Sequence, residues 1–581
     1  MLVYNVTFEV VKLNLNRKTN VLFCIILLFI ITLVIFQYTV TIREPWFGEL
    51  SDGHHQWLTG STLEFTENWY NEGPLNLDFA MLKNPSSIEF PTLSSREPYL
   101  SYPPGTIIPI YLVSEIVNHK PTVGLIMDYN LFNHFLIAFF LALIIFFFLI
   151  YLKFDTLNSF LFSIIPIMLE LLLPGPLYWQ QNVFFSDQAV LLPFVVYVFL
   201  EVLRDKFRDS PKNKNILRLN ILQNIVLFYG FLTDWLFVFI GITVYIKRIV
   251  DEDIVLSREM FLNKRINLFI KQTIKYWFAP LLALFLFLTQ IYTINSSFNS
   301  IISKALFRMG TTSQGEAYLN NGLNIFVGYI TSNYGHIAVA LLAGSLTFFI
   351  LMAIYLSLGR FKEHKNVFKI KKTLYLMGML LIPCVLQVMV FRNHSVIHDF
   401  SVLKFSIPLA TIPFVLVPIL IFLFFENPIN EKLKNIKASK RFSFNIGLLV
   451  LFLIIFTAAS SYTVNEYPNY KSMFPLVNNT YSVIGNSLEK NTYYNDIAFS
   501  PNFNISINPP QQLSYSMKRV YQINSINDVK GKVENINGNY NIVIVFLNPP
   551  SNYWSKILSK VTPVKDNGIY YYIFSSNTTI I

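Results

Sequence analysis

The sequence contains few charged residues and few cysteines. Only 14% of its 581 residues are charged, against roughly a quarter in ordinary soluble domains. Its two cysteines, Cys24 and Cys384, both lie inside apolar runs, so we predict neither a disulfide framework nor a cysteine metal site. It also has no Gly-rich phosphate loop, zincin motif or nucleophile elbow, which leaves the enzyme classes defined by those motifs without support.

Apolar side chains, in contrast, are abundant. Hydrophobic residues make up 53% of the chain, and 55 of its residues are Phe. Such a chain cannot bury its apolar surface in one water-soluble core, and many runs approach or exceed the roughly 18 residues that span a bilayer. We predict a polytopic α-helical membrane protein with eleven spans. These cover residues 21–42, 129–152, 156–173, 187–203, 216–231, 233–247, 272–294, 336–358, 373–391, 402–425 and 443–462.

The distribution of charge indicates membrane topology. The net charge is +11, but Lys and Arg stand in short clusters between apolar runs, as the positive-inside rule expects, so we predict no nucleic-acid partner. Lys12, Arg17 and Lys18 precede the first run and place the N-terminus in the cytoplasm. That run is too long for a signal-peptide core and is predicted to be retained. An odd number of spans then puts the C-terminus outside a cell membrane that the chain crosses many times.

Two apolar stretches need separate treatment. Ile216–Ile246 is almost continuously apolar but has basic clusters at both ends, so a single helix would place one cluster outside. Two short spans that turn at Gly230–Trp235 keep both clusters inside, and we prefer that interpretation. Ile107–Val117 is apolar but too short to span, and we expect it to lie in the interface or re-enter the membrane.

The predicted organisation has two parts. Residues 1–463 form the membrane part, with a first outer loop at 43–128 and a second at 295–335. Residues 464–581 are rich in Asn, Ser and Tyr and are predicted to form a small extracytoplasmic α/β domain. Its expected strands are Asp496–Phe499, Asn541–Phe546 and Gly568–Phe574, and its expected helices are Ser472–Leu488 and Tyr553–Lys560.

The densest polar segment follows the first span and contains Glu49, Asp52, His54 and His55. A carboxylate at the membrane boundary is partly desolvated, which raises its pKa and makes it a better base near neutral pH. The same residues could hold a divalent metal, although their spacing matches no recognised ligand motif. The plainer alternative is a solvated loop with an interfacial Trp.

Other polar residues gather at the predicted outer ends of the spans. Tyr102, Pro103 and Pro104 precede Gly105 and form a rigid corner where the first outer loop returns to the bilayer. Acids and cations at membrane depth are functional candidates, although the acids could be helix caps and the cations headgroup anchors. The acids are Asp187, Asp234 and Asp399, and the cations, which suit a phosphate, are Lys304, Arg308, Arg392, His394, His398 and Lys404.

These features together resemble the GT-C superfamily of membrane glycosyltransferases. An acidic residue, Glu49 or Asp52, follows the first helix. The long outer loop then ends in Tyr102-Pro-Pro-Gly105, which is similar to the Pro-Pro motif of protein O-mannosyltransferases and lipid A aminoarabinose transferases. Many spans and an extracytoplasmic C-terminal domain follow, so the resemblance covers most of the chain.

The resemblance implies a hexosyltransferase of the cell envelope. Its donor would be a polyprenyl or dolichyl phosphate sugar, and its acceptor a hydroxyl of a glycan, lipid or protein at the outer face. Asp52 is then the first candidate for the catalytic base and Glu49 the second. The first loop has no Asp-x-Asp, which metal-using members often carry, so no metal ligand is assigned and a divalent ion stays an open alternative. The oligomeric state is not predicted.

The substrate-binding residues that we expect are His54, His55, Tyr102, Pro103, Pro104, Asp187, Asp234, Lys304, Arg308, Arg392, His398, Asp399 and Lys404. Two other functions compete with this one. A transporter would place polar groups near mid-membrane, whereas here they crowd the outer ends. A non-catalytic receptor or scaffold would use the C-terminal domain to bind a ligand.

Overall fold

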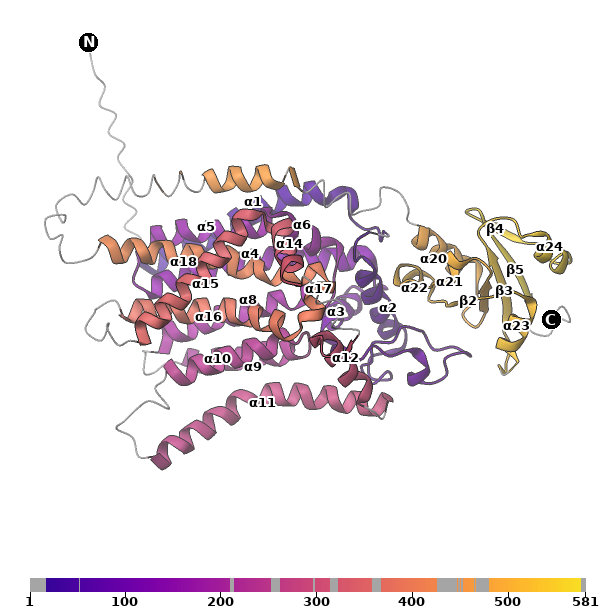
Figure 1. Ribbon diagram of the computed structural model, residues 1–581, viewed down its shortest axis with the longest axis horizontal. Helices are drawn as coiled ribbons and strands as arrows, with labels where there is room; N and C mark the ends of the chain where they lie inside the picture. Colours follow the sequence, from indigo (N-terminus) through magenta and orange to yellow (C-terminus); the bar gives the residue numbers. More distant parts are fainter. Residues whose placement is uncertain are drawn as a thin grey trace, which may run out of the picture.

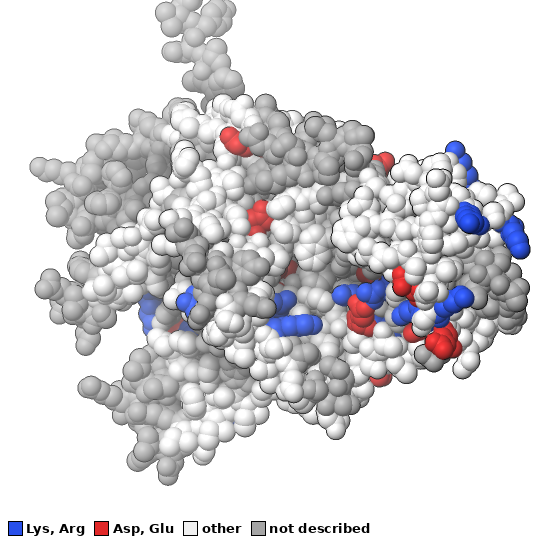
Figure 2. All heavy atoms as spheres, turned by 45° about the vertical axis from the view of Figure 1, so that its right-hand side comes forward, with Lys and Arg blue, Asp and Glu red and all other residues white. Residues whose placement is uncertain are grey.

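The computed structural model describes residues 17–51, 53–208, 214–251, 262–295, 298–313, 322–357, 367–425, 447, 450, 453–463, 465–466, 480–534 and 536–575. Its helices form an elongated bundle, and a sheet flanked by short helices lies at one end of it (Figure 1). The face drawn in Figure 2 is largely uncharged over the bundle, and its acidic and basic side chains gather mostly toward the sheet.

The bundle is built from long apolar helices. They are α1 (Arg17–Arg43), α4 (Val123–Tyr151), α5 (Thr156–Leu172), α8 (Leu191–Arg208), α9 (Lys214–Phe231), α10 (Leu236–Asp251), α11 (Leu262–Asn295), α15 (His336–Ser357), α16 (Val367–Val390) and α18 (Ser406–Phe425). Each of the first ten predicted spans, from 21–42 to 402–425, falls on one of these helices. At the eleventh predicted span, 443–462, the structure describes a helix over residues 453–463.

The helical membrane fold is therefore confirmed, but the number of spans is not. Among the described residues, six helices are long and apolar enough to cross a membrane. The count is seven if α5 and the helix α6 (Pro174–Asn182), bent by 61°, form one span. The predicted split of Ile216–Ile246 is confirmed, because α9 ends at Phe231 and α10 begins at Leu236.

Helix α4 lies at the centre of the bundle, where it packs against α5 and α8. Most of its side chains are buried, whereas α11 runs along the edge and leaves a large share of its apolar side chains exposed. Exposed apolar side chains on such a helix suit contact with lipid.

Short elements occupy the end of the bundle that faces the sheet. They include α2 (Trp57–Glu72), α3 (Ile108–Val117), α12 (Asn299–Met309) and α17 (Arg392–Ile397), as Figure 1 shows. Helix α3 falls on the short apolar segment 107–117, and its place in the interface or as a re-entrant segment stays a prediction. The remaining short elements are η1 (Glu44–Trp46), η2 (Leu93–Arg96), η3 (Pro104–Thr106), α7 (Ser186–Ala189), α14 (Gly322–Tyr334) and η4 (Asp399–Phe405).

The C-terminal part contains a five-stranded mixed sheet in the order β2-β1-β3-β5-β4. Strand β1 (Ile497–Ser500) pairs in parallel with β2 (Val520–Gln522) and with β3 (Asn541–Phe546), while β5 (Ile569–Ser575) pairs antiparallel with β3 and β4 (Val564–Asp566). The three predicted strands are confirmed. The edge strands β2 and β4, of three residues each, were not predicted.

The sheet is accompanied by short helices, some of which contact the membrane part. They are α20 (Thr480–Asn491), α21 (Phe503–Ser506), α22 (Pro510–Ser516), α23 (Ile526–Val533) and α24 (Asn552–Ile557). Helices α20 and α24 confirm the two expected helices, although residues 472–479 lie outside the described residues. Helix α22 packs on α2 so closely that a Cβ at Gly60 would lie 2.9 Å from the Pro510 carbonyl carbon.

Candidate functional site

The Pro-Pro-Gly corner packs against the turn between α9 and α10. The Gly105 amide donates a hydrogen bond to the Leu232 carbonyl at 2.7 Å, and the Trp235 indole donates to the Ser101 carbonyl at 3.1 Å. A Cβ on Gly105 would lie 2.3 Å from the Leu232 oxygen, so only glycine permits this approach. The corner thereby fixes the position of Tyr102, which precedes it.

Tyr102 in turn positions Arg308 of α12. The Arg308 guanidinium carbon lies 4.4 Å from the centre of the Tyr102 ring, and its Nη1 donates to the Ser101 carbonyl at 3.4 Å. A guanidinium over an aromatic face is attracted by the negative charge of that face. This contact connects two of the predicted residues from separate outer loops.

Arg308 lines a cavity of about 500 Å³ between the first outer loop, α12, α17 and α22. Its walls are largely apolar, and its polar lining is rich in nitrogen donors. The lining residues are Trp57, Leu58, Ser61, Phe65, Lys83, Glu97, Pro98, Tyr99, Ser101, Phe185, Lys304, Phe307, Arg308, His394, Ile397, His398 and Pro510. A largely apolar cavity with a few convergent cations suits an amphiphilic ligand with an anionic group.

Two adjacent histidines just before α2 meet a carboxylate that lies 345 residues after His54 in the sequence. His54 Nε2 lies 2.7 Å from Asp399 Oδ2, and His55 Nε2 lies 3.1 Å from Asp399 Oδ1. The Tyr178 hydroxyl donates to the His54 carbonyl at 2.8 Å and holds the backbone in place. The Trp179 ring centre lies 5.9 and 6.0 Å from the two imidazole centres. The pair is thus backed by the buried helix α6.

A second carboxylate lies deeper. Asp187 Oδ2 is 3.7 Å from His394 Nε2, and Asp187 Oδ1 is 3.7 Å from Lys404 Nζ. Among the described residues, Asp187 Oδ1, His394 Nε2 and Lys404 Nζ have no hydrogen-bond partner, although all three side chains are buried. Buried polar atoms are normally satisfied, so such a group indicates a place for a ligand or water.

His398 connects the two carboxylate clusters. Its ring centre lies 5.7 Å from that of His55 and 4.8 Å from that of His394. Four of the eight histidines in the chain therefore form one row between Asp399 and Asp187. Burial lowers the pKa of His398 to about 3. Burial also lowers the pKa of His394, so both rings are neutral donors or acceptors at neutral pH.

Comparison with solved structures identifies the architecture. The apo oligosaccharyltransferase of Archaeoglobus fulgidus superposes with a TM-score of 0.50 at 10% identity, over 91% of this chain and 70% of that one. The chain has the GT-C fold. ArnT from Cupriavidus metallidurans bound to undecaprenyl phosphate is also similar, with a TM-score of 0.48 at 9% identity, over 96% and 98% of the two chains. No protein-family model matches the sequence, and no curated protein matches it.

The GT-C fold brings most of the predicted residues to one end of the bundle. His54, His55 and Asp399 meet directly, and Asp187 meets Lys404. Lys304, Arg308 and His398 line the cavity. Tyr102 is buried, and Pro103 and Pro104 form the turn that holds it.

Glu49 and Arg392 stand apart from this group, whereas Asp234 lies within electrostatic range of Asp187, Lys404 and Arg308. Asp234 is buried and caps α10, because its Oδ1 accepts from the Leu236 amide at 2.7 Å and from Gln387 at 2.9 Å. Glu49 and Arg392 are exposed and are not part of the cavity lining. Asp52 lies outside the described residues.

The sequence analysis missed contributors whose only signal is their position in space. Tyr99 and Trp57 line the cavity, and Trp179 supports the two histidines. His394 was considered as one of the outer cations but was not selected among the substrate-binding residues. Aromatic residues make up 16% of the chain, so a single aromatic residue in the sequence does not indicate a functional site.

The donors His54, His55 and Asp399 fit a divalent metal. One ligand atom from each lies within 4.8 Å of the other two. Two imidazole nitrogens and one carboxylate oxygen form a set that suits zinc with an open fourth position. The three side chains are partly buried rather than sealed, so an ion has access to them.

Proposed function

We propose that this protein is a membrane glycosyltransferase that transfers a hexosyl group from a polyprenyl or dolichyl phosphate to an acceptor hydroxyl. The observation that carries the proposal is the cavity in which Lys304 and Arg308 face apolar walls, next to the buried atoms of Asp187, His394 and Lys404 that lack hydrogen-bond partners. A lipid phosphate has the anionic group and the apolar chain that such a site accommodates. The oligosaccharyltransferase whose fold is similar is itself a glycosyltransferase.

The cations would act on the leaving group. As the bond between the anomeric carbon and the phosphate oxygen breaks, negative charge grows on the lipid phosphate, and fixed cations in a low-dielectric cavity stabilise that charge. Arg308 is already oriented by Tyr102 and Ser101, so it needs no reorganisation during the reaction. Lys304, an exposed residue of the cavity lining, supplies a second charge at the same cavity.

The base would come from the segment that precedes His54. Asp52 is our first candidate and Glu49 the second, because the resemblance assigns this role to an acid after the first helix. The carboxylate takes the acceptor proton, and the acceptor oxygen attacks the anomeric carbon, which inverts its configuration in one displacement. An Asp52→Asn protein that inserts and transfers sugar at the wild-type rate would remove Asp52 from this role.

A divalent ion at His54, His55 and Asp399 would supply Lewis-acid stabilisation of charge beside the cavity. Without it, Asp399 still orients both imidazoles through the contacts described above. We place the N-terminus in the cytoplasm and the C-terminal domain, residues 464–581, on the outer face, where the donor must be membrane-borne. The acceptor would be a glycan, a lipid or a protein.

The test is binding and turnover by the full chain in proteoliposomes. Undecaprenyl phosphate serves as the binding probe and an undecaprenyl phosphate hexose as the donor, with release of undecaprenyl phosphate as the readout. Arg308→Met should weaken binding of the probe about tenfold or more, since a charged hydrogen bond contributes about 1.5–3 kcal/mol. Arg392→Met removes an exposed cation of the same outer region and should change binding less than about twofold. Equal effects of the two variants would refute the site.

A further inference from the structure

A second polar cavity, of about 340 Å³, lies at the opposite end of the bundle. It is enclosed by the last turns of α8 and α10 and by the first half of α9 and α11. Four cations line it, Arg204, Arg248, Lys271 and Lys275, together with the amides of Asn220 and Asn224. No Asp or Glu is among the described residues that form its lining.

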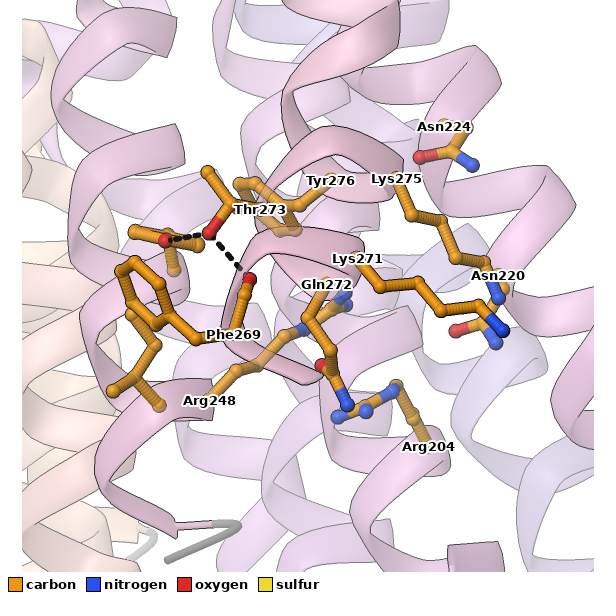
Figure 3. A pocket seen from close by; sticks show the side chains of 12 residues that line it. Arg204, Asn220, Asn224, Arg248, Phe269, Lys271, Gln272, Thr273, Lys275 and Tyr276 are labelled. Atoms are coloured by element: carbon orange, nitrogen blue, oxygen red, sulfur yellow. Dashed lines mark hydrogen bonds between the residues drawn. The ribbon is translucent and has the colours of Figure 1, made fainter. Parts of the chain in front are cut away.

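The cations of this cavity divide into two groups. Arg248 is held in place by Glu201, whose Oε2 accepts from Nη2 at 2.5 Å, and by Gln223, whose Oε1 accepts at 2.7 Å. Lys271 and Lys275, in contrast, are within ion-pair distance of no carboxylate in the described part of the chain. Figure 3 shows both lysines reaching from α11 toward Asn220.

The cavity region carries more positive charge than the nearby carboxylates balance. The nearby carboxylates Glu201, Asp205 and Asp251 already pair with Lys247, Arg248 and Lys372. Lys271 and Lys275 stand four residues apart, on one face of α11, and add positive charge that these carboxylates do not balance. An anion in the cavity would offset this charge and would accept hydrogen bonds from the lysines and the two asparagine amides.

The surroundings of the cavity are apolar and exposed. Ile225 on α9 and Phe278 on α11 are 58% and 66% exposed, and each lies within one turn of a lining residue of its own helix. In a membrane protein such side chains face lipid chains. A soluble anion would gain nothing from them, whereas a lipid places its phosphate among the cations and its chains along the apolar faces. Basic pockets between helices at the cytoplasmic side are known to accept anionic headgroups.

We propose that this cavity binds the phosphate of an anionic membrane phospholipid, on the membrane face opposite the candidate catalytic site. The lipid would bridge Lys271 and Lys275 of α11 to Asn220 and Asn224 of α9, and so attach the edge helix α11 to the bundle. This inference does not depend on the proposed function, because it uses none of the residues of the outer cavity.

The experiment is lipid binding to the purified full chain in detergent, followed by native mass spectrometry and thermal unfolding. Phosphatidylglycerol should bind and raise the unfolding temperature, phosphatidylcholine should not, and binding should weaken with added salt. The variant Lys271→Met/Lys275→Met keeps the apolar stems of both side chains and should weaken phosphatidylglycerol binding tenfold or more.

The matched control is Lys214→Met/Arg218→Gln, which removes two exposed charges from the same end of α9 outside the cavity lining. Its affinity for phosphatidylglycerol should stay within twofold of wild type. Equal weakening in both double variants would show general attraction to the surface and overturn the site. If glycerol phosphate or inorganic phosphate binds wild type as tightly as phosphatidylglycerol does, the assignment to a lipid is wrong. Lys271→Gln/Lys275→Gln provides a second variant if the Met protein is not recovered.

Discussion

The amide of Gly105 donates a hydrogen bond to the carbonyl of Leu232 at 2.7 Å, and there is no space for a Cβ between the two backbones. This contact joins the end of the first outer loop to the turn between α9 and α10. Tyr102 stands three residues before Gly105, and the Arg308 guanidinium packs on its ring. The backbone contact therefore determines where this cation of the cavity lies.

Gly105→Ala should therefore damage the site through its geometry. The added methyl group would sit 2.3 Å from the Leu232 oxygen, so the corner must shift, at a cost of about 1–3 kcal/mol. We expect sugar transfer to fall about tenfold or more, together with a lower unfolding temperature. Gly328→Ala on α14 is the control, since a Cβ there meets nothing within 4 Å and should be neutral or mildly stabilising. Wild-type transfer by Gly105→Ala would contradict the positioning role of the corner.

Metal binding at the histidine pair can be tested directly. If His54, His55 and Asp399 hold zinc, the purified protein should bind about one equivalent after dialysis, and Asp399→Asn should lose at least tenfold in affinity because the carboxylate charge is removed. Isothermal titration calorimetry measures both values. Asp234→Asn serves as the control, because Asp234 caps α10 and is not among the donors. Unchanged zinc affinity in Asp399→Asn would rule out this donor set.

Titration of Glu67 on α2 should make the stability of the protein depend on pH. Burial raises the pKa of Glu67 to about 7, and the nearby Lys120 ammonium at 2.5 Å opposes the rise. A raised carboxyl pKa contributes stability below the unfolded value of 4.5, and this contribution is lost as the pH rises through 7. Between pH 5.5 and 8.5 the loss should be about 2 kcal/mol.

Glu67→Gln should flatten that dependence and should be the more stable protein at pH 8.5. Thermal unfolding of the purified chain at the two pH values measures the effect. Glu489→Gln is a suitable control, since Glu489 also contacts Lys120, at 3.5 Å, but its side chain is 52% exposed. A wild-type slope that persists in Glu67→Gln would assign the dependence to other groups.

Much of the fold could be predicted from the sequence because the membrane imposes a simple pattern. Long apolar runs give the helices, and the basic clusters around 216–246 were enough to predict the break between α9 and α10. Strands β2 and β4 escaped prediction because three residues are too few to show alternation. Helix α2 escaped it because its apolar and polar residues are mixed and its buried face is defined by α22, far along the chain.

The candidate site was only partly predictable, for a related reason. His54 and His55 were selected because polar residues crowd the segment after the first helix. Their partner Asp399 lies 345 residues from His54 and was selected for a different reason, as an acid at a helix end. No local sequence pattern indicates that the side chains of His54 and His55 contact Asp399. The pairing of Asp187 with Lys404 is equally long-range and comes only from the packing of α7 against η4.

The contact between α2 and α22 leads to a last prediction, on the role of the C-terminal part. Pro510 of α22 lines the outer cavity, and Gly60 of α2 packs directly on its backbone. In Gly60→Ala the new methyl group would lie 2.9 Å from the Pro510 carbonyl carbon and 3.1 Å from the Gln511 amide nitrogen. Since backbone atoms cannot rotate away, α22 must move and that wall of the cavity opens.

We expect Gly60→Ala to raise the KM for the lipid donor several-fold with a smaller change in kcat, because the wall contacts the ligand and not the reacting bond. Cleavage by a protease within the C-terminal part should become faster as α22 loosens. The control is Gly531→Ala on α23, which adds the same methyl group to the C-terminal part but meets nothing within 4 Å. If Gly60→Ala changes neither KM nor the rate of cleavage, α22 is not a wall that the donor requires.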